Sequence, residues 1–271
     1  FTVAALASYI VGTIRGLPEI EASGADRGML SILGWVGLCL VACDGLKSRE
    51  SIDRLLQILT YLVSFVAFLG IIQFVTHFDI SNYISIPGLT ANGTLNTTAD
   101  RSGFLRVSAT TSHPIEFGVM VSCIYPLALH YALDDPRASK FVRWLVVAIL
   151  TIAIPLSVSR SAILGLTVAM IILLISWPSS RRWMALLVTP LILAAMRVTM
   201  PGLLGTLFSG FTHQDDSIKG RTDDYAVIGA YIDRSPFFGT GFGTFIPKTN
   251  IILDNQYLGS TVEMGYIGSG I

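Results

Sequence analysis

The stretch LLQILTYLVSFVAFLGIIQFVT, residues 55–76, contains no charged side chain. As an α-helix it would extend about 33 Å, close to the thickness of the hydrocarbon core of a bilayer. A run of this length and composition predicts a transmembrane helix. The rest of the chain is organised in the same way.

Further apolar runs of spanning or nearly spanning length occupy residues 1–14, 29–46, 114–133, 144–158, 162–177, 184–200 and 257–271. We read the first and the last as cut within membrane segments. We therefore expect a single membrane domain over residues 1–271, a fragment truncated at both ends. The fold class that follows is all-α, a polytopic transmembrane helix bundle with long external loops.

The composition agrees with a membrane environment. Hydrophobic residues make up 52% of the chain and charged residues 13%, about half of the share usual in soluble domains. The mean hydropathy is +0.65, and the formal net charge is zero, so nothing points to nucleic acid as a partner. The three cysteines, Cys39, Cys43 and Cys123, all lie in apolar segments and indicate neither a disulfide framework nor a metal site.

The linkers between the runs predict the topology. Three short linkers are basic; they contain Lys47, Arg49 and Arg54, then Arg137, Lys140 and Arg143, then Arg181 and Arg182. Short basic loops stay in the cytoplasm, so we expect these three on the inner side. The outer side then holds residues 15–28, an external loop over 77–113, the turn 159–161 and a large external loop over 201–256.

Arg160 stands between two short apolar runs, in Ser159-Arg160-Ser161, which predicts a tight hairpin. An arginine at that position is costly unless it faces the interface, a counter-ion or a cavity. One interpretation is that it reaches the lipid headgroups. The other is that its planar donor fork binds a phosphate group at the mouth of the bundle.

The second polar element begins at Arg221 and continues into the glycine-rich segment 235–243. It is either a solvated helix followed by a turn, or it brings Arg221 beside Arg160 as a second clamp on a diphosphate. It lacks the Lys-Ser/Thr of a P-loop. Residues 223–234 could form a short amphipathic helix at the membrane surface.

The third polar element surrounds Asp254, where the large loop returns to the membrane. Asp254 is either the N-cap of the last helix or a general base whose pKa is raised by partial desolvation. Earlier in the chain, His113 precedes the run 114–133, and Glu116 fits a first-turn acid that complements the helix dipole. The histidines have no ligand-like spacing, so no zinc site is predicted.

Together these elements resemble the O-antigen ligase and O-antigen polymerase superfamily of bacterial envelope glycosyltransferases. Arg160 and Leu164 fit the family's Arg-x-x-x-Leu element, and 236–241 fits its Pro-x-x-Gly-x-Gly turn after a loop arginine, here Arg221. The third family element, His-Asn followed by Gly-x-x-Gly, is matched by Asn255, Tyr257, Leu258, Glu263, Gly265 and Gly268. The segment 108–117 is also similar to a family stretch. The family's usual histidine is replaced by Asp254.

The resemblance implies a membrane fold of the glycosyltransferase C-like type, in which Asp254, Arg160 and Arg221 are catalytic. Asn255, Tyr257 and His113 would join the two arginines in binding substrate. The implied donor is a glycan on undecaprenyl diphosphate, and the implied acceptor is a glycan or a lipid. No cofactor and no metal are implied. The implied location is the bacterial cytoplasmic (inner) membrane, with membrane lipids around a multi-pass protein whose active site faces outward.

Two other classes remain open. A transporter would carry ionisable or helix-breaking positions near the middle of the membrane, often in repeated halves. The candidate charges instead cluster at one interface and no repeat is visible. A catalytically inactive scaffold for envelope assembly is the other alternative, and the replacement of the family histidine by Asp254 keeps it open.

Cysteine labelling tests the predicted topology. We expect Lys140→Cys to be protected from a membrane-impermeant thiol reagent added outside, and Arg221→Cys to react, because the first lies in a short basic loop and the second in a long polar one. Labelling of both positions from the same side would contradict the topology.

Overall fold

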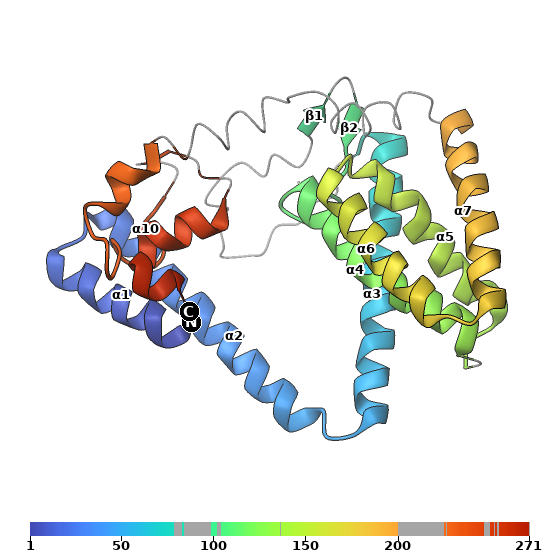
Figure 1. Ribbon diagram of the computed structural model, residues 1–271, viewed down its shortest axis with the longest axis horizontal. Coiled ribbons are helices and arrows are strands. Elements are labelled where there is room, and N and C mark those ends of the chain that lie inside the picture. Colours follow the sequence, from blue (N-terminus) through green and yellow to red (C-terminus); the bar gives the residue numbers. More distant parts are fainter. Residues whose placement is uncertain are drawn as a thin grey trace. The chain divides into compact units, whose positions relative to one another are not determined.

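The computed structural model describes residues 1–78, 83, 99–101, 104–135, 137–199, 225, 227–246, 250, 251, 253 and 255–270. The chain forms two compact units, which we describe separately. Unit 1 comprises residues 1–47 and 214–271, and unit 2 comprises residues 48–213. Both units are built from helices, as predicted (Figure 1).

Unit 2 is an antiparallel helical bundle. Its helices are α3 (Arg49–Thr76), α4 (Pro114–Asp134), α5 (Lys140–Leu156), α6 (Arg160–Ser176) and α7 (Ser179–Thr199). Helix α4 is central and packs against α3, α5 and α6. The core between these helices includes Phe117, Val121 and Leu150, all fully buried. A short antiparallel ribbon, β1 (Ala99–Arg101) and β2 (Phe104–Arg106), interrupts the predicted loop 77–113.

Unit 1 contains α1 (Thr2–Arg15), α2 (Glu19–Gly45), the segment 227–246 and α10 (Gln256–Ser269). Helix α1 packs against α2 and α10. Residues 227–232 are helical, and Ile228 and Ile232 are buried against Val262 of α10. The apolar side of the predicted amphipathic helix is therefore covered by protein.

Large apolar side chains cover the outside of both units, as lipid-facing surfaces require; examples are Leu30, Trp35, Leu38, Phe65, Ile171 and Leu187. Among the described helices, α2, α3 and α4 are long and apolar enough to span a bilayer, and α1 and α6 are shorter apolar helices. The fold is therefore a helical membrane bundle.

Several helices begin earlier than predicted, because they extend into polar sequence that was assigned to loops. Helix α2 begins at Glu19, so most of the predicted outer loop 15–28 is helical. Glu19 and Glu21 lie in its first turn after Pro18, where acidic side chains complement the helix dipole. Likewise, Arg49 and Arg181 belong to the first turns of α3 and α7 rather than to loops.

Helix α10 is broken at Gly265, whose φ of 68° and ψ of −177° are not helical. The break frees backbone groups on both sides of it, and the turn at 236–241 binds them. The Thr240 and Gly241 amides donate to the carbonyls of Val262 and Glu263 at 2.9 and 3.0 Å. In the other direction, the Tyr266 and Ile267 amides donate to the carbonyls of Pro236 and Phe237 at 2.8 and 3.3 Å. We call these four bonds the break–turn pairing.

Glycine is required on both sides of the break–turn pairing. Gly239 has a φ of 72°, and a Cβ there would lie 2.1 Å from the Glu263 carbonyl oxygen. A Cβ on Gly265 would lie 2.3 Å from the carbonyl carbon of Phe237. Since the atoms in the way are backbone atoms, no side-chain rotation could relieve either clash.

We therefore expect Gly239→Ala and Gly265→Ala each to destabilise the protein by about 1–3 kcal/mol or more, the usual scale of overpacking. The matched control is Gly259→Ala in α10, where a Cβ would meet nothing within 4 Å. This control should be neutral or stabilise by about 0.5–1 kcal/mol. Thermal unfolding in detergent micelles measures the difference, and parent-like melting of Gly239→Ala would contradict the close approach.

Candidate functional site

The first turn of α10 carries two of the predicted site residues. Asn255 is the N-cap, because its side-chain oxygen accepts from the Tyr257 amide at 3.0 Å. Its Nδ2 donates to the Tyr225 hydroxyl at 2.9 Å, which ties α10 to the end of the large loop. The Tyr257 side chain is 83% exposed and available to a ligand. Asp254 lies outside the described residues. One interpretation made it the N-cap of the last helix, but the N-cap of α10 is Asn255.

Glu263 connects three segments of unit 1 at the break in α10. Its carboxylate accepts from the Phe245 amide at 3.2 Å. Its carbonyl accepts from the Gly241 amide and from the Ser8 hydroxyl of α1, the latter at 2.5 Å. From the sequence, Glu263 was only one of the residues that match the family motif. In the structure its carboxylate holds the segment after the turn, at Phe245, against α10.

In unit 2, Arg160 is the first residue of α6. The hydroxyl of the preceding Ser159 is the N-cap and accepts from the Ala162 amide at 3.4 Å. The predicted hairpin is present, with Ser157–Ser159 as its turn. Val158 in this turn has a φ of 46°, which is strained for a β-branched residue. Backbone strain concentrates at functional sites, which is consistent with the role predicted for Arg160.

A second arginine supports the turn that precedes Arg160. Arg106, at the end of β2, is buried, and its Nε donates to the Ser157 carbonyl at 3.2 Å. The next amide, Val107, donates to the Leu156 carbonyl at 3.1 Å. From the sequence, Arg106 was expected only to lie in the external loop 77–113. Its position directly before the stretch 108–117, which is similar to a family segment, was the sequence feature that could have indicated a structural role.

His113 is the N-cap of α4, since its Nδ1 accepts from the Ile115 amide at 3.1 Å. Glu116 lies in the first turn of α4, as expected. Capping occupies one ring nitrogen of His113 and leaves only Nε2 for substrate binding.

The other end of unit 2 holds a charged cluster that connects the three basic linkers. The Arg137 guanidinium bonds Asp53 of α3 at 2.5 Å and Asp135 at 2.8 Å. Arg181 of α7 forms two bonds with Asp134, at 2.6 and 3.0 Å. The bond from Arg137 holds the pKa of the buried Asp135 carboxyl below its usual range. The linkers therefore meet at one end of unit 2, opposite the end that holds Arg160.

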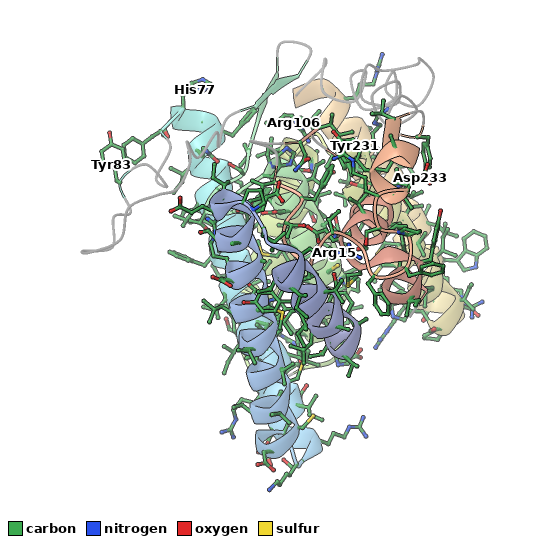
Figure 2. The ribbon with its side chains drawn as sticks, turned by 90° about the vertical axis from the view of Figure 1, so that its left-hand side faces the viewer. Arg15, His77, Tyr83, Arg106, Tyr231 and Asp233 are labelled. Atoms are coloured by element: carbon green, nitrogen blue, oxygen red, sulfur yellow. The ribbon has the colours of Figure 1, made fainter. Side chains whose placement is uncertain are left out.

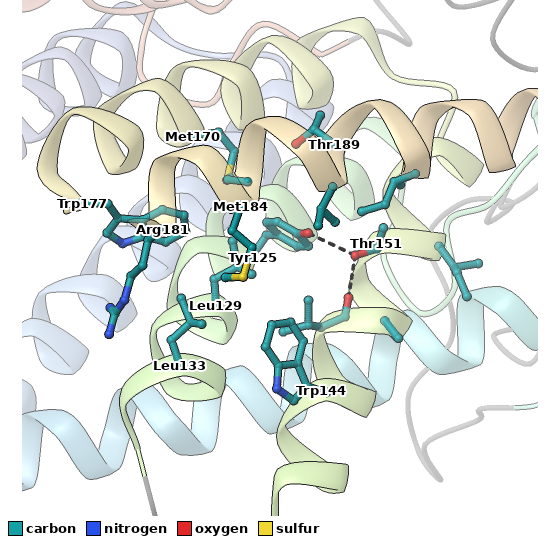
Figure 3. Close-up of a pocket in the computed structure, with 16 residues that line it drawn as sticks. Tyr125, Leu129, Leu133, Trp144, Thr151, Met170, Trp177, Arg181, Met184 and Thr189 are labelled. Carbon is teal, nitrogen blue, oxygen red and sulfur yellow. Dashed lines mark hydrogen bonds between the residues drawn. The ribbon is translucent and has the colours of Figure 1, made fainter. Parts of the chain in front are cut away.

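A groove of about 400 Å³ lies between α7 and the rest of unit 2, near the charged cluster (Figure 3). Its walls are apolar, with Trp144 and Trp177 at its sides and a hydrogen bond between Tyr125 and Thr151 in its wall. Arg181 lies at one edge and is occupied by Asp134. The groove suits a hydrocarbon chain, and it lies at the end of α6 away from Arg160.

The predicted site residues are thus divided between the two units. Arg160 and His113 belong to unit 2, and Asn255 and Tyr257 belong to unit 1. Arg221 and Asp254 lie outside the described residues, so their approach to Arg160 stays a prediction. Within the described ranges, no group of three or more His, Cys, Asp or Glu side chains is arranged to hold a metal ion.

Most of the predicted site residues lie in a segment that matches a known protein family. The model of the O-antigen ligase family matches residues 145–271, from α5 to the end of the chain. We refer to this segment below as the O-antigen ligase domain because of this match. It includes Arg160, the turn at 236–241 and the motif residues in and before α10, on which the sequence resemblance rests. The apolar helices indicate a membrane protein, and the family match supports glycan transfer of the O-antigen ligase type. No curated protein and no solved structure matches the chain.

Helices α1 to α4 precede the O-antigen ligase domain, so Arg15, Arg106 and His113 lie outside the matched residues. Helices α1 to α4 nevertheless contact it. Arg106 bonds the turn before Arg160, and Ser8 of α1 bonds Glu263. The domain is therefore completed by contacts from the helices that precede it.

The Asn255 contacts predict a stability difference within the O-antigen ligase domain. Asn255→Ala removes both the cap and the bond to Tyr225, and we expect a loss of about 1 kcal/mol or more in the free energy of unfolding. Tyr225→Phe removes only the bond and should cost less. Thermal unfolding of the two variants measures this, and an Asn255→Ala variant as stable as the parent would show that the cap is dispensable.

Proposed function

We propose that the protein transfers a glycan from undecaprenyl diphosphate to the hydroxyl of an acceptor glycan or lipid, at the outer face of the bacterial cytoplasmic membrane. The observation that carries the proposal is the break–turn pairing, which joins two motifs of the O-antigen ligase family into one backbone structure. The pairing fixes the half of α10 that begins at Asn255, directly after Asp254.

In the proposed reaction the acceptor oxygen attacks the anomeric carbon of the donor sugar, and the bond from that carbon to the diphosphate oxygen breaks. Asp254 takes the proton of the acceptor hydroxyl as general base. Undecaprenyl diphosphate leaves with the bonding electron pair, and its developing negative charge requires stabilisation by cations.

Arg160 and Arg221 are the proposed ligands of the diphosphate. A guanidinium offers two parallel donors to phosphate oxygens and stays charged at any working pH. Arg160 also stands at the N-terminus of α6, where the helix dipole favours an anion. Because arginines would neutralise the leaving group, the proposal requires neither a metal nor a cofactor. The exposed Tyr257, and His113 through its Nε2, are proposed substrate contacts.

The membrane orientation belongs to the same proposal. The charged cluster of unit 2 gathers the basic linkers that the positive-inside rule assigns to the cytoplasm. The end of unit 2 that holds Arg160 would then face outward, which suits a donor presented at the outer leaflet. The apolar groove beside α7 would open in the cytoplasmic half of the membrane, away from the proposed diphosphate position.

The test of the proposal is turnover of a radiolabelled undecaprenyl-diphosphate-linked glycan by the purified protein in liposomes. If Asp254 is the base, Asp254→Asn should bind the donor but lose roughly 10²–10⁴ in turnover. Asp254→His restores the family pattern and should keep activity, with a pH profile moved toward the range of imidazole. Since Asn255 caps α10, the loss in Asp254→Asn would not come from helix fraying.

The matched control is Asp233→Asn, which removes an exposed carboxylate from the same unit. It should turn over like the parent. Parent-like turnover of Asp254→Asn would assign the base elsewhere. A parent protein that binds donor without any transfer would instead support the inactive scaffold.

A further inference from the structure

Helix α1 presents one face of small residues to the O-antigen ligase domain. Ala5, Ser8, Gly12 and Arg15 follow one another at spacings of three, four and three, so they share one side of the helix. Ala5 is fully buried beside Met264 of α10. A Cβ on Gly12 would lie 2.8 Å from the Thr240 carbonyl oxygen. Small side chains on this face therefore let the backbone of the turn approach α1 closely.

Arg15 ends this face and contacts Gly239 in the turn and Ser235 directly before it. Its Nη1 donates to the hydroxyl of the buried Ser235 and, at 3.1 Å, to the carbonyl of Gly239. Arg15 is labelled in Figure 2. The Gly239 amide donates in turn to the Ser235 carbonyl at 3.0 Å and closes the turn. Hydrogen bonds from a charged donor are roughly twice as strong as neutral ones. Arg15 thus fixes Ser235 and Gly239. Pro236 and Phe237, which bind the break in α10, lie between these two residues.

We propose that Arg15 is a positioning residue of the glycan-transfer site, an inference that rests on the proposed function. Arg15 holds the turn, the turn holds the break in α10, and the break fixes the half-helix that begins at Asn255. It lies outside the residues matched by the O-antigen ligase family. The catalytic half-helix therefore takes its position from a side chain of α1, more than 200 residues earlier in the chain.

Kinetics of three variants test the proposal. Arg15→Gln removes the charged fork, and we expect kcat to fall by roughly 10²-fold, because a small displacement of a catalytic group costs about that much. KM for the undecaprenyl-diphosphate-linked glycan should stay within about threefold of the parent, since Arg15 does not touch the donor. Arg15→Lys retains one charged donor and should recover part of kcat.

The control is Arg27→Gln, because Arg27 lies in α2 of the same unit and, among the described residues, its side chain donates to the Ser23 carbonyl of its own helix rather than to the turn or to α10. Its kcat should equal that of the parent. A loss in Arg15→Gln confined to KM would overturn the positioning role and assign Arg15 to donor binding. Parent-like kcat in Arg15→Gln would also overturn it.

A spectroscopic measurement tests the same contact without any substrate. Spin labels at Phe237→Cys on the turn and Gln256→Cys at the start of α10 report their separation, in a background in which Cys39, Cys43 and Cys123 are alanine. Both label positions are exposed. We expect the distance distribution to broaden in Arg15→Gln and to stay narrow in Arg27→Gln.

The two measurements separate the possible failures. An unchanged distance distribution in Arg15→Gln would overturn the role of Arg15, whatever the kinetics show. A parent that transfers no glycan would overturn the proposed function alone. In that case broadening in Arg15→Gln would still support Arg15 as the residue that fixes the turn to α10.

Discussion

The structure of unit 1 depends on the pairing between the break in α10 and the turn at 236–241. Buried backbone amides and carbonyls must find partners inside the protein, because an unpaired buried polar group is costly. The break at Gly265 takes four such groups out of the helix, and the turn satisfies all four. The break in α10 and the turn therefore each leave backbone groups unpaired without the other. Helix α2 also approaches the segment after the turn closely. A Cβ on Gly24 of α2 would lie 2.5 Å from the Gly243 carbonyl oxygen.

Unit 2 meets the same constraint with whole helices and places its polar groups at the two ends. One end holds the charged cluster around Arg137, whose partners come from α3 and the linker after α4. The other end holds Arg160 behind a strained turn that Arg106 supports. Between these ends the core is apolar, and the groove beside α7 is apolar as well. The charged side chains described in unit 2 therefore lie at the ends of the bundle.

The apolar runs predicted the helices of both units, because length and hydropathy alone are enough to indicate a span. They misplaced boundaries such as the start of α2, since a membrane helix can continue beyond the lipid into polar sequence. Arg160, which was predicted in the turn 159–161, is instead the first residue of α6, and Asn255 caps α10. The role of Arg15 was not predictable, because its partners are more than 200 residues away and include a backbone carbonyl. The break–turn pairing was equally hidden, since backbone groups leave no trace in side-chain patterns.

Amide hydrogen exchange tests the break–turn pairing most directly. In the parent protein in lipid nanodiscs, the amides of Thr240, Gly241, Tyr266 and Ile267 should exchange slowly. If the pairing exists, Gly239→Ala should abolish the protection of all four together, because the bonds form one unit. If α10 were instead a continuous helix, Tyr266 and Ile267 would bond within it and would stay protected in Gly239→Ala. That result would contradict the account.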